Sequence, residues 1–307
     1  MQFFRNLQIC GLYLISVYFL ASLSACGGGA ISAASVAGGV NTSANTSSTT
    51  PLQTTPIPTT PTWKLVWSDE FAGTGLPDPN KWGYDTSRNQ VGWYNNELQY
   101  YARDRLENAR VENGKLIITA RKERLISAAD YGNQAYTSAR LVTRGIASWT
   151  YGFFEVRAKL PCGAGTWPAI WTLGAKGAWP ADGEIDIMEQ FGNNKTEVLG
   201  TIHTQANNFF NGTSGPGLGG KTAAPDSCTN FHNYQLTWSA DEIVIGIDDM
   251  PYFVYKNPKN GSFAQWPFDN PQYLILNLAI GGDLGGAVPA TFTPQLMEVD
   301  YVRIHQR

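Results

Sequence analysis

Charge is scarce in this chain of 307 residues: 15% of its residues are charged, and the net charge is -3. Neither a basic patch nor a long run of like charges occurs. Nucleic-acid-binding proteins use clustered lysine and arginine to neutralise phosphates, so that class has little support. Histidine is rarer still, and the spacing of the three histidines fits no zinc-ligand pattern, which disfavours a zinc site.

Helical periodicity is also missing. The chain has no internal repeat, and its 32 glycines and 17 prolines recur too often for long helices. Strand patterns take their place: apolar and charged residues alternate over 154–160, as in a half-buried strand. Shorter apolar segments at 116–119, 243–247 and 274–276 predict more buried strands. The pattern therefore predicts an all-β sandwich.

Every hydrophobic run is short for a membrane-spanning helix, which needs about 20 apolar residues. The apolar stretch from about residue 7 to 21 follows Arg5 and is typical of a signal sequence. The tetrapeptide LSAC at 23–26 resembles a bacterial lipobox, in which residues 1–25 are removed and Cys26 is lipidated. Gly27 lacks the aspartate associated with inner-membrane retention, which favours the outer membrane. An ordinary signal peptide or a short transmembrane anchor is the alternative.

A stretch without any charge follows Cys26. It is rich in glycine, then in threonine, serine and proline, and cannot bury enough apolar surface to fold. Residues 26–62 are therefore expected to form a disordered tether with a reach of roughly 35 Å. The folded domain is expected over 63–307, enough for one large sandwich. We expect a monomer in the bacterial cell envelope, lipid-anchored or secreted.

Cysteine is scarce, with four residues in the chain. Removal of Cys10 with the signal sequence and lipidation of Cys26 leave Cys162 and Cys228. In an oxidising compartment these two could form a disulfide, which would contribute about 4 kcal/mol by loop-closure arithmetic. Two buried free thiols are the alternative.

Acidic residues cluster at one place, the segment GEIDIMEQ at 183–190. Glu184, Asp186 and Glu189 stand among isoleucine and methionine, where desolvation and like charge oppose ionisation. Such a cost is tolerated mostly where acids do chemistry, and hydrolysis of a glycosidic bond needs one protonated and one ionised carboxyl group. A solvated turn is the alternative, and the apolar residues between the acids argue against it.

The spacing of the acids favours a strand with an irregularity. On a helix Glu184 would face away from the other two acids, whose directions differ from it by about 200° and 140°. On a regular strand Glu184 and Asp186 share a face and Glu189 points to the other. One extra residue, a β-bulge near Ile187–Met188, would return Glu189 to that face.

The spacing of these three acids resembles the signature of glycoside hydrolase family 16, which is Glu-x-Asp-x-x-Glu in its bulged bacterial form. Further blocks resemble the endo-β-1,3-glucanases (laminarinases) of that family and follow their order: NELQYY at 96–101, GTWPAIW at 165–171, GTIHT at 200–204, WPFD at 266–269, LILNLA at 274–279 and VDYVR at 299–303. The resemblance covers essentially all of residues 63–307.

The resemblance implies a jelly-roll sandwich of two antiparallel sheets with a concave substrate cleft, and a retaining mechanism. Glu184 matches the nucleophile, Glu189 the general acid/base, and Asp186 the acid that assists both. Neighbouring carboxylates would raise the pKa of Glu189, as its role requires. A retaining pair needs carboxyl groups roughly 5–5.5 Å apart. Catalysis of this kind needs no cofactor.

Several residues are candidates for binding the sugar chain. Trp167 and Trp171 would share one strand face and could stack on sugar rings. The alternative is that both are core residues; we expect one of them to be, with Trp167 as the cleft residue. Trp266 lies in a loop and matches a family substrate contact. Asn96, Glu97 and His203 complete the expected set, with a structural turn or a satisfied core histidine as the alternatives.

The resemblance also implies one calcium ion on the convex side, bound by Glu70, the carbonyl of Gly114 and Asp300. Such oxygen ligands suit calcium. One departure concerns 283–286, DLGG, where many laminarinases carry asparagine and tryptophan, so that a contact at the cleft edge is in doubt.

Three functions compete. The first is endo-hydrolysis of β-1,3-glucan, and the second is hydrolysis of mixed β-1,3/1,4-glucan or of another polysaccharide such as agarose. The third is a glycan-binding lipoprotein without activity, which would not need Glu184 and Glu189. The GTIHT and WPFD blocks favour glucan.

Overall fold

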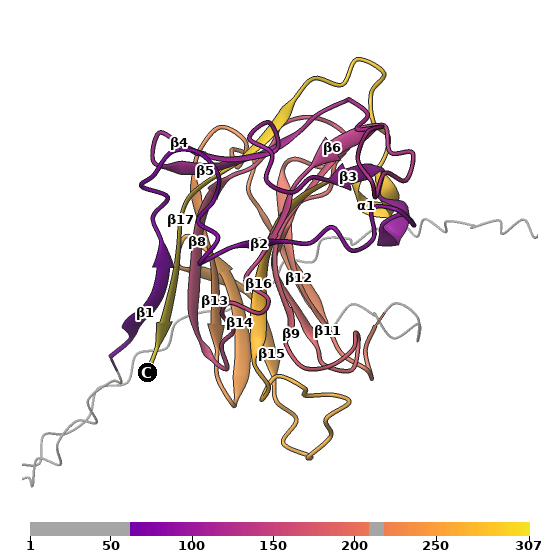
Figure 1. The fold of residues 1–307 in the computed structure, drawn as a ribbon. Coiled ribbons are helices and arrows are strands. Elements are labelled where there is room, and N and C mark those ends of the chain that lie inside the picture. The colour runs from indigo at the N-terminus through magenta and orange to yellow at the C-terminus, as the bar shows by residue number, and fades with distance from the viewer. Residues whose placement is uncertain (1–61, 209–217) are drawn as a thin grey trace, which may run out of the picture. The chain divides into compact units, whose positions relative to one another are not determined.

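The computed structural model describes residues 62–208 and 218–307. The predicted signal sequence, Cys26 and most of the tether lie outside these residues. Two large antiparallel sheets, stacked as two layers, are the main secondary structure of the described residues (Figure 1). Within the described ranges, no helix has both the length and the apolar character needed to cross a membrane.

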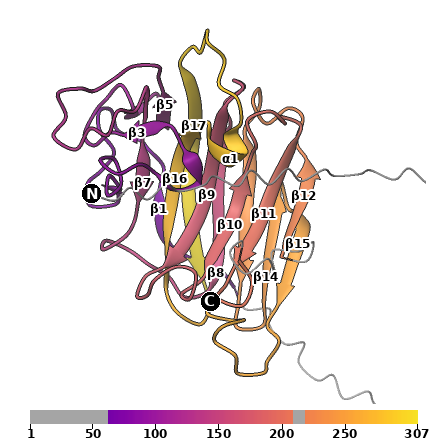
Figure 2. The ribbon, with the colours of Figure 1, turned by 90° about the vertical axis from the view of Figure 1, so that its right-hand side faces the viewer.

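The two sheets are assembled from strands that are far apart in the sequence. The eight-stranded sheet has the order β15 (Met250–Lys256), β14 (Glu242–Ile247), β13 (His232–Trp238), β8 (Gly152–Lys159), β17 (Gln295–Gln306), β5 (Lys115–Ala120) and β4 (Ala109–Glu112), with β1 (Lys64–Asp69) also paired to β17. The seven-stranded sheet, which faces the viewer in Figure 2, has the order β12 (Gly219–Ala223), β11 (Glu197–His203), β10 (Glu184–Glu189), β9 (Thr166–Gly174), β16 (Gln272–Ile280), β7 (Arg140–Val142) and β2 (Gly83–Tyr84). The predicted all-β jelly-roll sandwich is confirmed.

The main core lies between the sheets. On β8, Phe154, Val156 and Ala158 are fully buried, while the residues between them are partly exposed, so the predicted alternation is confirmed. From the opposite layer, Ile185 and Ile187 of β10 join the same core. These inward residues leave the other face of β10 available for polar side chains.

The outer face of the seven-stranded sheet carries smaller elements on one side. A parallel pair, β3 (Gln99–Tyr101) with β6 (Tyr136–Ser138), the 3-10 helix η1 (Tyr94–Asn96) and α1 (Gly282–Gly285) lie together there (Figure 1). The amide of Leu98 donates to the carbonyl of Ile280 at 2.9 Å. The Asn96 side chain donates to Asp283 at 2.8 Å. Asp283, in the segment that departs from the family pattern, thus joins two of these elements.

A disulfide joins Cys162, just after β8, to Cys228, just before β13, with their Cα atoms 5.2 Å apart. Next to it, the amide of Leu160 donates to the carbonyl of Ser227 at 2.8 Å. The bridge therefore ties the segments flanking two paired strands of the eight-stranded sheet.

Candidate active site

The three acids of β10 share the outer face of the seven-stranded sheet because the strand is bulged. In the pairing with β9, Asp186 faces Trp171 and Met188 faces Ile170, so that Ile187 is an extra residue. Ile187 and Met188 are both fully buried in the main core. The bulge predicted from the spacing is present, and it returns Glu189 to the face of the other two acids.

The acids are packed with a histidine from the next strand. Glu184 is the register partner of His203, and Asp186 that of Thr201. The Asp186 carboxylate lies 3.3 Å from Nε2 of His203, and the Thr201 hydroxyl donates to the same carboxylate. One ligand atom each from Glu184, Asp186 and His203 lies within 4.8 Å of the others.

Burial dominates the electrostatics of this cluster. Desolvation, followed by the charge of Asp186, raises the pKa of Glu189 to about 8, and the same two causes raise the pKa of Glu184 well above its ordinary value. Desolvation lowers the pKa of His203, but hydrogen bonding to Asp186 and the charges of all three acids outweigh it and raise that pKa to about 9. An imidazolium at neutral pH therefore balances part of the acidic charge.

The protonation of His203 also bears on metal binding. Glu184, Asp186 and His203 offer the donors that an ion could use, but a metal-binding histidine must be neutral. Because Asp186 already holds the ring nitrogen Nε2, the arrangement is that of an ion-paired cluster.

Both tryptophans of β9 lie on the face of the acids. The Trp167 indole donates to Oε1 of Glu189 at 2.9 Å, and the Trp171 indole donates to Asn277 at 2.7 Å. Neither ring belongs to the core between the sheets, so the alternative of a core position does not apply to that core. Trp171 packs on a small outer cluster with Tyr273 and Ile275.

Glu97 is half-buried, and its carboxyl group is hydrogen-bonded within the protein. It accepts hydrogen bonds from Gln99 at 2.7 Å and from the Tyr101 hydroxyl at 3.3 Å. The Tyr101 hydroxyl in turn accepts one from Asn277 at 3.0 Å, and Asn277 holds Trp171. Desolvation raises the pKa of Glu97. Glu97 is therefore linked through hydrogen bonds of Tyr101 and Asn277 to the Trp171 indole.

The sequence interpretation missed two residues near Trp171, and only the first of them carried a signal in the sequence. Asn277 is the one polar residue in the apolar run LILNLAI of β16, and a buried amide needs partners. Arg140 is buried, with its guanidinium 4.6 Å from the ring centroid of Trp171 and 3.3 Å from Asp85. Only the surroundings of Arg140 distinguish it from an ordinary surface arginine.

The expectation for Trp266 is wrong in one respect. Its side chain is 5% exposed and belongs to the main core, with its ring stacked on Tyr255 and in edge contact with Phe268. The indole N–H donates to Asp269 at 2.8 Å. The loop sequence suggested exposure, but the ring packs into the core against these two aromatic side chains, so an exposed stacking surface is not available there.

The three predicted calcium ligands come from different segments of one region. Asp300 lies between Val299, which pairs with β5, and Val302, which pairs with the end of β1, and Gly114 and Glu70 adjoin those two strands. The Glu70 carboxylate accepts two hydrogen bonds from Arg303, and Asp300 accepts one from Arg157 at 3.0 Å. Both carboxylates are half-exposed and engaged by these arginines, so the calcium site stays a prediction.

Comparison with known sequences decides the family. A profile described as Glycosyl hydrolases family 16 matches residues 96–303, which include all three acids. The chain belongs to glycosyl hydrolase family 16. This family 16 chain is 50% identical over 258 residues to a beta-glucanase of Rhodothermus marinus, covering 80% of this chain and 86% of that protein. It is 38% identical over 257 residues to a glucan endo-1,3-beta-glucosidase of Cryptopygus antarcticus, covering 78% and 91%.

Solved structures agree with the family assignment. The family 16 fold matches SCLam, described as a non-specific endo-beta-1,3(4)-glucanase, with a TM-score of 0.76 and 56% identity, covering 80% of this chain and 91% of that one. It matches the laminarinase from Rhodothermus marinus with a TM-score of 0.73 and 50% identity, covering 80% and 98%. The protein is therefore a glycoside hydrolase.

Proposed function

We propose that this protein is an endo-acting, retaining hydrolase of β-1,3-glucan, with Glu184 as the nucleophile and Glu189 as the general acid/base. The observation that carries the proposal is the bulged strand β10, which gathers three acids and His203 on one face. The names of the similar glucanases support the substrate.

The reaction has two steps, and in both Glu189 transfers the proton while Glu184 forms or releases the bond to the sugar. Glu189, held by the Trp167 N–H, protonates the glycosidic oxygen while ionised Glu184 attacks the anomeric carbon and forms a glycosyl-enzyme ester. Glu189 then takes a proton from water, whose oxygen displaces Glu184. Because the His203 imidazolium is the register partner of Glu184, it favours the ionised nucleophile. No cofactor enters this chemistry.

A second enzymatic specificity has support from the relatives. SCLam is described as a non-specific endo-beta-1,3(4)-glucanase, so mixed-linkage glucan is a further candidate substrate. A keratan-sulfate endo-1,4-beta-galactosidase of Sphingobacterium multivorum is 36% identical over 253 residues, which keeps galactans such as agarose among the substrates to test.

Glycan binding without catalysis is the competing function. A beta-1,3-glucan-binding protein of Penaeus monodon is 36% identical over 179 residues, covering 48% of both chains. A binding protein would gain nothing from three clustered acids, whose burial is costly. The presence of Glu184, Asp186 and Glu189 therefore favours the enzyme.

The test is reducing-sugar release from laminarin, curdlan, mixed-linkage glucan, agarose and carrageenan. We expect release from laminarin, and its loss to below about a hundredth in Glu184→Gln, since the nucleophile cannot be replaced by an amide. The thermal midpoint of this variant should stay near that of wild type, because it removes repulsion and opens no cavity. The matched control is Glu112→Gln, on the exposed end of β4.

Residual activity of more than a few per cent in Glu184→Gln would remove the nucleophile assignment. Release from agarose but not from laminarin would assign a galactanase. A folded protein that binds laminarin and cleaves nothing would favour the binding function.

We further propose that the protein is anchored to the bacterial outer membrane through a lipid on Cys26, with residues 26–62 as a tether, and that it acts as a monomer. The lipobox-like LSAC sequence supports the anchor. Labelling with a radioactive fatty acid should mark the wild-type chain and not Cys26→Ser. Equal labelling of both would refute lipidation.

A structural calcium ion held by Glu70, Gly114 and Asp300 is also part of the proposal. Because the ion would join segments that are distant in sequence, calcium should raise the thermal midpoint of the wild-type protein. Asp300→Asn should weaken that response, whereas identical midpoints in calcium and in EDTA would argue against the site.

A further inference from the structure

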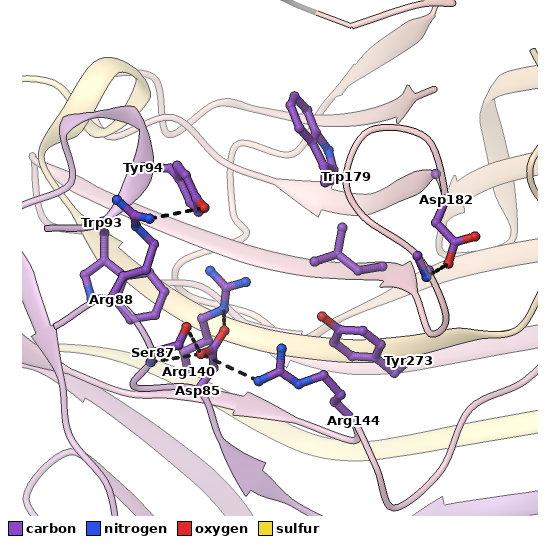
Figure 3. A pocket seen from close by; sticks show the side chains of 14 residues that line it. Asp85, Ser87, Arg88, Trp93, Tyr94, Arg140, Arg144, Trp179, Asp182 and Tyr273 are labelled. Carbon is purple, nitrogen blue, oxygen red and sulfur yellow. Dashed lines mark hydrogen bonds and ion pairs between the residues drawn. The ribbon is translucent and has the colours of Figure 1, made fainter. Parts of the chain in front are cut away.

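A pocket of about 250 Å³, whose lining side chains are drawn in Figure 3, opens on the same face of the sheet as the acids, as the strand register shows. Leu173 of β9 and Tyr273 of β16 line it, and these two residues stand in one cross-strand row with Glu184. Neighbouring strands lie 4.7–4.9 Å apart, so the Cα atoms of Glu184 and Tyr273 are about 10 Å apart. A sugar chain that extends from the acids across β9 and β16 therefore reaches this pocket.

Aromatic side chains from separate elements stand at the pocket opening. Figure 3 shows Tyr94 and Trp179 on different sides of it, and the two side chains are 63% and 38% exposed. Tyr94 belongs to η1, and Trp179 to the connection between β9 and β10. Exposed aromatic faces of this kind can pack on the apolar face of a sugar ring.

The carboxylates of the pocket are already engaged. Asp85 accepts hydrogen bonds from the amide and the hydroxyl of Ser87 and pairs with the buried Arg140 at 3.3 Å. Asp182 accepts two backbone N–H groups, at 3.0 Å and 2.7 Å. Both carboxylates therefore already have hydrogen-bond or ion-pair partners within the protein.

Two arginines at the pocket have no close carboxylate partner. The Arg144 side chain is 52% exposed, lies over the Tyr273 ring at 5.8 Å and reaches Asp85 at 3.9 Å, which is long for a charge-assisted hydrogen bond. Arg88 lies over the Tyr94 ring at 4.1 Å and donates to the Tyr94 hydroxyl and to the carbonyl of Gly92, but pairs with no carboxylate of the described residues. With Arg140, three cations face two acids here, whereas the whole chain has a net charge of -3.

We propose that this pocket binds an anionic substituent of the glucan, such as a sulfate, phosphate or carboxylate group, with Arg144 and Arg88 as its charge partners. A guanidinium group matches the geometry of such oxyanions through paired N–H donors. The inference rests on the proposed glucanase function and extends its substrates to glucans that carry negative charge near the scissile bond. Uncharged glucan remains a substrate, because Arg88 and Arg144 contact Tyr94, Tyr273 and Asp85 rather than the acids or the tryptophans of β9.

The experiment compares kcat/KM of the full chain on laminarin, on laminarin sulfate and on carboxymethyl-laminarin of equal, low substitution. The variants are Arg88→Gln, Arg144→Gln and the double variant. The control is Arg110→Gln, which removes an arginine of β4 that pairs with Glu112 outside the pocket. We expect the double variant to lose about tenfold on the anionic glucans, the size of one charge-assisted hydrogen bond, and to keep its rate on laminarin within about twofold.

Salt supplies a second signature. Because the two cations are partly exposed, added sodium chloride should lower the wild-type rate on anionic glucans and should leave the rate on laminarin unchanged. The double variant should lose this salt dependence. A larger effect on the sulfate than on the carboxymethyl derivative, or the reverse, would identify the favoured substituent.

Equal loss on neutral and anionic glucans in the double variant would make the pocket an ordinary sugar subsite and would overturn the proposal. Rejection of both anionic glucans by wild type would do the same. Affinity electrophoresis in gels that contain laminarin or laminarin sulfate separates this proposal from the catalytic one. Stronger retardation by the sulfated glucan, relieved in the double variant, supports the pocket even if no glucan is cleaved.

Discussion

Glu189 is the residue whose proton limits the proposed reaction at alkaline pH. Burial and Asp186 raise its pKa to about 8, and the acid role needs the protonated form, so kcat/KM should fall as the pH rises through about 8. The Trp167 N–H stabilises the ionised carboxylate and so lowers this pKa. Trp167→Phe should therefore move the alkaline limb to higher pH.

The measurement is a pH profile of laminarin hydrolysis for both proteins. Trp167→Phe also removes contact area from the cleft, so its KM should rise at every pH. A lower rate with an unmoved alkaline limb would mean that Trp167 binds the sugar without tuning Glu189.

Trp266 is a residue of the core, and its replacement should test stability more than binding. Its ring is stacked on Tyr255 and in contact with Phe268, so Trp266→Ala should cost about 3–5 kcal/mol of unfolding free energy. Denaturant unfolding gives this value directly. Trp179→Ala is the matched control, since its 38% exposed ring should contribute far less. Weakened laminarin binding with unchanged stability would restore Trp266 to the substrate contacts.

The bulge is the feature of strand β10 that places the acids, and a deletion can test it. Removing Ile187 makes the strand regular: Glu184, Asp186 and Glu189 then alternate with inward residues and still share one face. Removing Ile185 instead sets Glu184 next to Asp186, so that the two point to opposite faces. We expect measurable laminarin hydrolysis from the first variant and none from the second.

Each deletion takes one buried isoleucine from the core and should cost about 2–5 kcal/mol, so circular dichroism must establish that both variants fold. Hydrolysis by the Ile185 variant, or none by a folded Ile187 variant, would contradict the role given to the bulge.

Strand β10 was predictable from the sequence, whereas the loops around the cleft were not. Alternation has a period of two residues, so Ile185 and the acids reveal the strand and its bulge within six positions. The hydrogen bond between Asn96 of η1 and Asp283 of α1 joins residues that are 187 positions apart, and no local sequence pattern predicts it. The prediction for Trp266 was wrong for a different reason: its aromatic partners Tyr255 and Phe268 are close in sequence, but the sequence does not show that the loop folds its rings into the core.

At the scale of the whole molecule, the pocket beside the acids shows what a single sequence hides. The pocket is lined by side chains from separate parts of the chain, among them Arg144, Tyr94 and Trp179. In the sequence, each of these looks like an ordinary surface residue. Their convergence depends on the order in which β9, β16, β7 and β2 pair. The resemblance to a family implied a sandwich of two antiparallel sheets, but it did not bring these three side chains together.

The disulfide between Cys162 and Cys228 closes a loop across paired strands of the eight-stranded sheet, and its removal should act on the whole domain. With 66 positions between the cysteines, the unfolded chain loses loop entropy equivalent to about 4 kcal/mol when the bridge forms. The double variant Cys162→Ala, Cys228→Ala should therefore unfold at lower denaturant by about that free energy. Its kcat/KM on laminarin should stay near wild type, because neither cysteine lies on the face of the acids. Wild type treated with a reductant should approach the same midpoint, and Cys26→Ser serves as the control. Identical midpoints for oxidised and reduced wild type would show that the bridge does not stabilise the fold.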